Sequence, residues 1–277
     1  MKKLTEDNYY SLEMNNEYCS VSQFKSFQKC EMATMAELKG EYVKERAKST
    51  QTALDVGSYV DCALTEPNKL PKFLEEHPNM IASTGKNKGN LKSEYLIANK
   101  MIERCKSSDF FMKTLSGSHQ TIMTGEIEGV PFKIKMDAYK EGKWITDLKT
   151  CESIRKMYWD DVYRTKVPFI KAYGYDIQGA IYREIVRQNT GDTLPFFIAA
   201  VSKENVPDIE VIQISSEMLD DKLEEIKPYI EQIKLLKSGE IEPTKCCECD
   251  YCKAHKVLTR PILLEELMGL TEGDSDE

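Results

Sequence analysis

The sequence contains no long apolar run and only 3 histidines. Its opening residues 1–7 include no apolar signal region, and no stretch approaches the length needed to cross a bilayer. These absences argue against a membrane-spanning protein and favour a reducing cytoplasm, where disulfides are rare. His77, His119 and His255 lie in unrelated contexts, so they form no evident ligand set.

Positive charge is also scarce relative to negative charge. The chain has 38 Lys and Arg against 46 Asp and Glu, a net charge of -8. This balance argues against binding nucleic acid through overall charge, although the acidic tail at 272–277 contributes to the sum. No P-loop is present, because Gly85 and Gly89 lack the required spacing and no Gly-Lys-Ser/Thr follows.

Length and composition indicate one elaborated α/β domain. A chain of 277 residues with 41% hydrophobic and 30% charged residues can bury a sizeable core. No internal repeat or long linker divides it. We therefore expect a single domain over residues 1–270, with a helical part at about 20–115, a core at about 120–240 and a disordered acidic tail at 271–277.

Hydrophobic periodicity predicts the order of the elements. We expect helices first, then a group of strands, a helix after Phe169, two further strands and a long helix that Ser216 caps and Gly239 follows. The expected helices lie at about 22–47, 51–64, 92–115 and 216–238, and the two later strands at 196–201 and 208–215.

Two carboxylates and a lysine lie on a predicted hairpin. Phe132, Ile134 and Met136 alternate with polar residues up to Asp137, which indicates a strand. Gly142 lies midway between Asp137 and the run Asp147-Leu148-Lys149, so a turn there brings the two aspartates opposite each other. A two-residue loop would turn Asp147 to the other face of the sheet, so a shared site needs a three-residue connection or a bulge.

The segment after the hairpin is a helix by its pattern. Ile177, Ile181 and Ile185 recur at every fourth position and can face a core. Gln178 and Tyr182 form a separate pair, also four residues apart, on a neighbouring face.

Cysteines are concentrated near the end of the chain. Four of the nine fall within seven residues, which gives Cys246-x-x-Cys249-x-x-Cys252 with Cys247 as a spare. Three thiolates leave one position of a metal centre open, and Cys30 is the candidate fourth ligand, with His255 in reserve. In a reducing compartment such a cluster indicates a metal site. Iron-sulfur, Zn²⁺ and free or disulfide-forming thiols remain as alternatives. The remaining cysteines lack any such spacing and are expected in the core: Cys19, Cys62, Cys105 and Cys151.

The order of these motifs resembles the PD-(D/E)xK nuclease superfamily in its RecB-like branch. Gly57-Ser-Tyr-Val-Asp61 resembles the first motif of that branch, although many relatives carry His where this chain has Asp61. Phage or prophage exonucleases related to exodeoxyribonuclease VIII (RecE) show the closest resemblance, over about residues 20–258. The resemblance implies a restriction-endonuclease-like α/β/α core with a central mixed sheet, a helical N-terminal addition and a C-terminal Cys cluster.

The resemblance implies metal-assisted hydrolysis of phosphodiester bonds in DNA. Asp61, Asp137, Asp147 and the Leu148 carbonyl would ligate Mg²⁺ or Mn²⁺. Lys149 would orient or help deprotonate the attacking water. The remaining motif residues, Gln178 and Tyr182, would position Lys149 or the DNA end.

The resemblance also bears on the cysteines and on partners. Iron-sulfur nucleases of the superfamily carry one Cys near the N-terminus and three near the C-terminus, which implies a [4Fe-4S] cluster on Cys30, Cys246, Cys249 and Cys252, with Zn²⁺ as the alternative. It implies action in the cytoplasm of a bacterial host during phage recombination or DNA end processing. A single-strand annealing protein is an expected partner, while strand preference, polarity, exo or endo action and oligomeric state remain open.

Basic residues offer a path for a DNA backbone. Lys133 and Lys135 share the predicted face of Asp137, and a Gly/Lys-rich loop carries Lys86, Lys88 and Lys92. A plain surface loop remains the alternative for the latter. Glu126 is either a further ligand or base, or a solvated residue. A non-catalytic DNA-binding protein with a Zn or iron-sulfur module and a recombination accessory remain as other functions.

Overall fold

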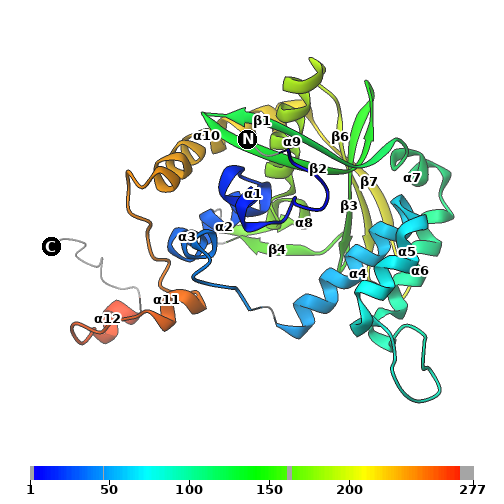
Figure 1. The fold of residues 1–277 in the computed structure, drawn as a ribbon, viewed down its shortest axis with the longest axis horizontal. Helices are drawn as coiled ribbons and strands as arrows, with labels where there is room; N and C mark the ends of the chain where they lie inside the picture. Colours follow the sequence, from blue (N-terminus) through cyan, green and yellow to red (C-terminus); the bar gives the residue numbers. More distant parts are fainter. Residues whose placement is uncertain (1–2, 46, 161–163, 269–277) are drawn as a thin grey trace.

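A computed structural model describes residues 3–45, 47–160 and 164–268 (Figure 1). The predicted acidic tail at 271–277 lies outside the described residues. The chain forms the α/β architecture expected from the sequence, with a central mixed sheet covered by helices on both faces.

Five strands form the central sheet within the described ranges, in the order β1-β2-β3-β6-β7. All neighbours are antiparallel except β3 and β6, which run parallel. The second strand of the parallel pair, β6, is buried on both faces, as the continuous apolar run in its sequence predicts. The strands are β1 (Ser118–Ile127), β2 (Val130–Lys140), β3 (Trp144–Cys151), β6 (Phe196–Ser202) and β7 (Ile209–Ile214).

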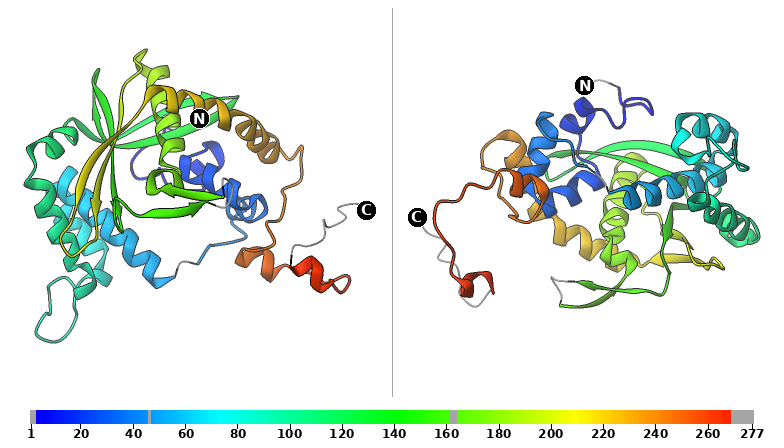
Figure 2. Two further views of the ribbon diagram at one scale, coloured as in Figure 1. Left: turned by 180° about the vertical axis from the view of Figure 1, so that it is seen from behind. Right: turned by 90° about the horizontal axis from the view of Figure 1, so that it is seen from below.

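Each face of the sheet carries its own apolar core. Helices α9 (Tyr175–Thr190) and α10 (Ser216–Ser238) pack on one face, where Phe132, Ile181 and Phe196 are buried together. Helices α4 (Lys48–Thr65), α6 (Leu96–Lys106) and α7 (Asp109–Thr114) cover the other face. Figure 2 shows these two layers from behind and from below.

The β2–β3 hairpin has the three-residue connection that the site requires. Lys140 pairs with Trp144, so residues 141–143 form the loop, and Gly142 adopts a φ of 64° that suits glycine. Ala138 pairs with Thr146 in the last pair of the ladder, so Asp137 and Asp147 lie one residue beyond it and both line the same cavity. The expectation of a shared face is therefore confirmed.

The β2 and β3 strands separate just beyond this point. Their register ends at Ala138 and Thr146, and the freed edge of β2 bonds to the N-terminal segment instead. The Cys19 amide donates to Pro131 O over 2.8 Å, and the Lys133 amide donates to Cys19 O over 2.9 Å. The two aspartates thus lie at a fork in the sheet, where space opens between the strands.

The predicted helix at 22–47 is wrong in extent. It is two short helices, α2 (Val21–Lys29) and α3 (Glu31–Lys39), followed by an irregular connection to α4. Cys30 separates them: its extended backbone ends α2, and its Sγ accepts from the Ala33 amide to cap α3. The break turns Cys30 out of a continuous helix. A first short helix, α1 (Leu12–Glu17), precedes them.

Other boundaries also differ from the sequence expectation. The predicted helix at 92–115 breaks between α6 and α7, where Ser108 caps the latter. The helix after Phe169 divides at Gly174, which has a φ of 61°. A two-stranded sheet, β4 (Met157–Asp160) with β5 (Thr165–Pro168), was not expected. The remaining short helices between these elements are α8 (Phe169–Ala172), η1 (Pro67–Lys69), α5 (Leu70–Glu76), η2 (Pro78–Met80) and η3 (Ser93–Tyr95).

The end of the chain returns to the N-terminal helices. Ser215, one residue before the predicted cap, caps α10, and Gly239 ends it as expected. The following segment carries α11 (Asp250–Ala254), which packs on α3, and then α12 (Leu264–Leu267). Both views in Figure 2 show α11 beside the N-terminal helices. None of the helices in the described parts of the chain is long and apolar enough to cross a bilayer.

Candidate active site and cysteine centre

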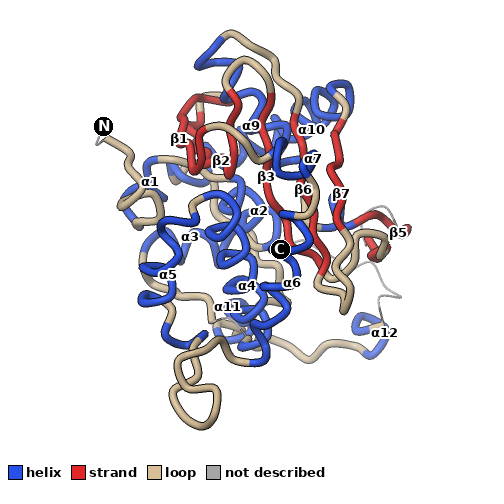
Figure 3. Tube along the Cα trace, turned by 90° about the vertical axis from the view of Figure 1, so that its right-hand side faces the viewer, coloured by secondary structure: helices blue, strands red, loops and turns tan. Residues whose placement is uncertain are grey.

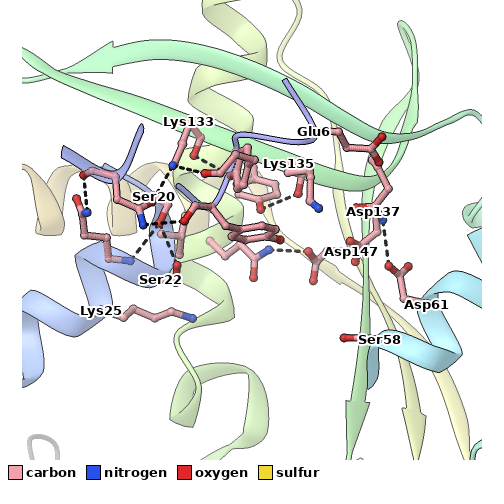
Figure 4. A pocket seen from close by; sticks show the side chains of 18 of the residues that line it. Glu6, Ser20, Ser22, Lys25, Ser58, Asp61, Lys133, Lys135, Asp137 and Asp147 are labelled. Carbon is pink, nitrogen blue, oxygen red and sulfur yellow. Dashed lines mark hydrogen bonds between the residues drawn. The ribbon is translucent and has the colours of Figure 1, made fainter. Parts of the chain in front are cut away.

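A cavity of about 1,020 Å³ lies over the fork between β2 and β3. The N-terminal segment with α2 forms one side, α4 and α5 form another, and the strands and α9 form the base. Figure 4 shows the side chains of Asp61, Asp137 and Asp147 within this space. Residues that are distant in the sequence therefore share one polar chamber.

Asp137 and Asp147 are held by hydrogen bonds across the fork. The Leu148 amide donates to Asp137 Oδ2 over 2.8 Å, so this carboxylate replaces the ladder bond that the separating strands no longer make. Gln178 Nε2 donates to Asp147 Oδ1 over 2.5 Å. Asp147 Oδ2 accepts no hydrogen bond from a described residue and faces the Lys149 ammonium in an ion pair.

The helix pair contacts the site differently from the expectation. Gln178 orients Asp147 rather than Lys149, and the Tyr182 hydroxyl donates to Lys135 O over 2.9 Å. Tyr182 therefore fixes the backbone of β2 beside Asp137. Both residues line the cavity, so the structure brings the predicted pair to the site.

Asp61 reaches the cavity from α4 on the opposite face of the sheet. Its Oδ1 accepts from Thr65 Oγ1 over 3.2 Å, and its Oδ2 accepts from Gln120 Nε2 over 3.0 Å. Gln120, at the start of β1, was missed in the sequence because no motif marks it. Its backbone φ of 49° is unusual for a residue other than glycine. Its side chain orients the Asp61 carboxylate through the hydrogen bond to Oδ2.

Burial and neighbouring carboxylates raise the pKa values of Asp61 and Asp137. Burial is the first cause and raises the pKa of Asp61 to about 6, with Asp147 adding to the effect. Burial, together with Asp61 and Asp147, raises the pKa of Asp137 well above its ordinary value. Burial alone would lower the pKa of Lys149, but Asp147 and Asp137 outweigh it, so the net shift is upward and the side chain stays a cation.

This donor set fits a divalent cation. Buried carboxylates without an adjacent compensating charge repel each other, and a cation among them relieves that repulsion. Oxygen atoms are the ligands that Mg²⁺ and Mn²⁺ prefer. Asp147 Oδ2, whose one partner among the described residues is the Lys149 ammonium, is the oxygen of this carboxylate that could ligate such an ion. A ligand role for the Leu148 carbonyl stays a prediction.

The basic residues differ in what they can reach. Lys133 is 1% exposed, and its ammonium donates to Tyr9 O and to Asn15 Oδ1. It therefore anchors the N-terminal segment rather than contacting DNA. Lys135 lines the cavity beside the rings of Tyr9 and Tyr10.

The predicted loop lysines lie away from the cavity. Lys86 and Lys88 are on an exposed loop that projects from the helical side (Figure 3), and neither they nor Lys92 lines the chamber. Glu126 is exposed on β1 outside the chamber lining, which favours the solvated reading. A backbone-binding role for the loop stays a prediction.

The four predicted cysteines come together where α11 packs on α3. The sulfurs of Cys30, Cys246, Cys249 and Cys252 all lie within 4.8 Å of one another, and Cys30 Sγ is 3.5 Å from Cys252 Sγ. Cys247 is exposed and outside this group, so it stays a spare. His255 Nδ1 donates to Tyr251 O over 2.8 Å, and His255 is not a member of the group.

Backbone amides point at these sulfurs. The Ala33, Cys249 and Cys252 amides donate to the sulfurs of Cys30, Cys246 and Cys249 over 3.3–3.5 Å. The Glu248 and Cys249 amides lower the pKa of Cys246 to about 6, which favours its thiolate. Such donors stabilise the anionic sulfurs that a metal requires.

The segment before the cysteines is tied to α3 and α10 by one buried carboxylate. Glu31 Oε2 accepts from the Thr244 amide over 2.9 Å and from its hydroxyl over 2.8 Å, while Glu31 Oε1 accepts from Gln232. The Met32 amide donates to Thr244 O. These contacts hold Cys30 close to the three C-terminal cysteines, although Cys30 and Cys252 are 222 positions apart in the sequence.

The sulfur separations fit one metal centre. Tetrahedral zinc with Zn–S bonds of about 2.3 Å places its sulfurs roughly 3.8 Å apart, within the range seen for these thiols. A four-iron cluster interposes its own iron and sulfide atoms, so its cysteines lie farther apart. The Cys-x-x-Cys-x-x-Cys spacing, in contrast, is that of iron-sulfur ligands. The four thiols are therefore placed so that they could bind one metal centre.

An α/β/α core with acidic residues and a lysine at a forked hairpin defines the PDDEXK-like class. A sequence model of the family described as a PDDEXK-like domain of unknown function, DUF3799, matches residues 20–255, so the chain belongs to this family. A comparison with curated proteins found no match. These findings support a nuclease function.

The chain is also similar to a solved structure. A crystal structure of a "Putative exonuclease" from Eubacterium rectale is 41% identical in sequence, with a TM-score of 0.87. The similarity covers 96% of this chain and 98% of the other. The shared fold therefore extends over the N-terminal helices and the cysteine segment as well as the sheet.

Proposed function

We propose that the protein is a metal-dependent DNA exonuclease. The observation that carries this proposal is the convergence of Asp61, Asp137, Asp147 and Lys149 on one cavity, from three different elements. A protein that only binds DNA has no need to bury three mutually repelling carboxylates beside a lysine. The PDDEXK-like description of the family and the description of the similar crystal structure as a "Putative exonuclease" support the same reaction class.

The proposed ion site uses the carboxylates and the Leu148 carbonyl. Mg²⁺ or Mn²⁺ bound there would polarise the scissile phosphate and stabilise the leaving oxygen. Asp137 and Asp147 are preoriented for this role by the Leu148 amide and by Gln178. Asp61 is preoriented by Gln120 and Thr65.

Lys149 would act on the attacking water and on the phosphate. Its ammonium is held beside Asp147, and its side chain is 20% exposed, so it can reach a reactant in the cavity. As a cation it offsets the charge that develops on the phosphoryl oxygens. Because neighbouring carboxylates raise its pKa, we assign orientation of the water and charge stabilisation to Lys149 rather than proton removal.

Two observations favour attack at DNA ends. The similar crystal structure is described as an exonuclease. In addition, Lys69 Nζ pairs with Glu6 over 3.0 Å and joins the N-terminal segment to η1, and both residues line the cavity. A link between the two sides hinders lateral entry of a continuous strand and leaves entry of an end. Both side chains are half exposed, so the link is weak, about 1 kcal/mol or less.

We place the enzyme in phage or prophage recombination or in DNA end processing in a bacterial cytoplasm, with a single-strand annealing protein as partner. The four-cysteine group would hold an iron-sulfur cluster by its spacing, with Zn²⁺ as the alternative that the sulfur separations favour. This centre would join the two ends of the chain around the catalytic core.

The test follows nucleotide release from linear and circular DNA. We expect release from linear DNA with Mg²⁺ or Mn²⁺, none with EDTA, and much slower action on circles. Asp147→Asn should lower the rate by about 10²–10³-fold, since it removes a charged ligand and the partner of Lys149. Asp192→Asn, on the exposed loop after α9, is the matched control and should keep the full rate. Full activity in EDTA, or in Asp147→Asn, would contradict the proposal.

A further inference from the structure

A second lysine besides Lys149 lines the cavity, and it comes from a different element. Lys25 lies on α2, where the amphipathic pattern buries Phe24 and Phe27 and turns Lys25 towards the chamber (Figure 4). Its aliphatic stem passes Gly174, at which a Cβ atom would lie 3.0 Å from Lys25 Cδ. The bend between α8 and α9 thus leaves room for this side chain. No motif had marked Lys25 in the sequence.

The ring of Tyr175 contacts both lysines. Lys149 Nζ is 4.8 Å from the ring centroid, and Lys25 Nζ is 5.5 Å from it. Tyr175 is the first residue of α9, one turn before Gln178, so the helix that orients Asp147 also carries this ring. An aromatic ring attracts cations, so Tyr175 can hold both ammonium groups near the site.

The Lys25 ammonium has unused hydrogen-bonding capacity. It donates to Tyr173 O over 3.0 Å, and that oxygen is its one hydrogen-bond acceptor among the described residues. No carboxylate in the described ranges forms an ion pair with it. An ammonium has three donors, so two remain for a group in the cavity.

Electrostatics support an anionic ligand at this position. Burial is the first cause and, with Lys149, lowers the pKa of Lys25 to about 8, although Asp147 opposes the shift. Asp147 is paired with Lys149, and no carboxylate of the described residues forms an ion pair with Lys25, so the repulsion between the two ammonium groups is only partly compensated. A phosphate next to both would compensate that cost and satisfy the remaining donors.

We propose that Lys25 binds a backbone phosphate of the DNA beside the scissile group, and that Tyr175 is the residue that positions Lys25 and Lys149 on either side of it. This inference rests on the proposed function, because it assigns a contact within the same site. Lys25 then holds the strand while Lys149 serves the reacting phosphate. The two lysines divide binding and chemistry between them.

The test measures binding to a fluorescent single-stranded oligonucleotide in EDTA over a series of potassium chloride concentrations. Each lost phosphate contact lowers the slope of log affinity against log salt by about 0.7 for single strands. We expect that decrease for Lys25→Gln and a slope close to that of the wild type for Lys25→Arg. Lys171→Gln, an exposed lysine on α8 outside the cavity lining, is the matched control and should keep the wild-type slope.

Kinetics separate the positioning role of Tyr175. Lys25→Gln should raise KM several-fold with a smaller effect on kcat, because binding is its task. Tyr175→Leu should change both, whereas Tyr175→Phe retains the ring and should restore both. Equal losses in Tyr175→Phe and Tyr175→Leu would overturn the positioning role.

The outcomes distinguish this inference from the proposed function. An unchanged salt slope in Lys25→Gln would overturn the phosphate contact even if the wild type degrades DNA. Absence of DNA degradation by the wild type, with the slope decrease present, would overturn the exonuclease and leave the contact in place. Wild-type protein that binds no DNA would overturn the contact as well.

Discussion

The carboxylate site and the cysteine centre are built in opposite ways. Asp137, Asp147 and Lys149 lie on adjacent strands of the sheet, within thirteen positions of sequence, and each is fixed by the register of one hairpin. The cysteine centre joins Cys30 to a triplet near the other end of the chain. Local geometry creates the first site, and tertiary contact creates the second.

The two sites also differ in what supports them. The carboxylates lie on a sheet with an apolar core on each face, so the fold can sustain their mutual repulsion. Around the cysteines only a small cluster is buried, with Cys30, Ala33 and Cys252 at its centre. We therefore expect the carboxylates to lower the stability of the fold, and a metal bound by the cysteines to raise the stability of their segment.

Removing a charge from the carboxylate site should give the largest effect and the clearest separation of activity from stability. Asp137→Asn should lower nucleotide release by about 10³-fold, because it removes a charged metal ligand. An Asn oxygen can still accept from the Leu148 amide, and repulsion by Asp61 and Asp147 falls. We therefore expect the metal-free variant to be more stable by about 1 kcal/mol in urea unfolding. A large loss of stability would contradict the comparison.

The converse variant should change stability more than chemistry. Cys249→Ser should lose the bound metal and, by opening the contact of α11 with α3, expose the segment after Gly239 to proteolysis. The expected loss of unfolding free energy is about 2–3 kcal/mol, with residual nuclease activity. Cys247→Ser is the matched control, because Cys247 is exposed and outside the group. Equal behaviour of the two variants would show that no shared centre exists.

A smaller effect is expected from the residue that orients Asp147. Gln178→Leu removes the hydrogen bond to Asp147 Oδ1 and keeps most of the side-chain volume in α9. We expect a fall in kcat of about 10–100-fold, typical of a lost orienting contact. Gln188→Leu on the same helix, which contacts β1 far from the cavity lining, should leave kcat unchanged. A wild-type kcat in Gln178→Leu would remove this residue from the site.

The smallest effect concerns the buried lysine that anchors the N-terminal segment. Burial is the first cause that lowers the pKa of Lys133 to about 8, against 10.5 for an ordinary lysine. Between these values the unfolded chain binds more protons, so the contribution of Lys133 to the unfolding free energy rises with pH. The unfolding free energy of the wild type minus that of Lys133→Met should therefore increase from pH 8 to 10, by about 1 kcal/mol per pH unit. A difference that is constant with pH would contradict the assignment.

Much of the carboxylate site could be predicted because its signals are local. The alternation before Asp137, the turn at Gly142 and the helical spacing of Gln178 and Tyr182 all operate over short distances. The three-residue loop was the one open question, and the register answers it. The cysteine group could be predicted because metal ligands have recognisable spacing, even across 222 residues.

The missed features depend on contacts between distant segments. Gln120, Lys25 and Tyr175 carry no motif, and their roles follow from the positions of α4, Lys149 and Gly174. The continuous helix predicted at 22–47 was wrong because Cys30 adopts an extended backbone that no propensity indicates. Lys133 was expected to face DNA, but the N-terminal segment covers it. The alternation of apolar and polar residues in β2 assigned Lys133 to the correct face of the sheet. It could not show that the N-terminal segment covers that side chain.

The rate of nucleotide release by Lys149→Ala tests the central claim most directly. The measurement compares this variant with the wild type on the same end-labelled linear DNA in Mn²⁺, with Lys143→Ala in the exposed hairpin loop as control. The account predicts a rate lower by about 10²-fold or more for Lys149→Ala, with an unchanged rate for Lys143→Ala. Undiminished release by Lys149→Ala would contradict the assignment of this site as a nuclease.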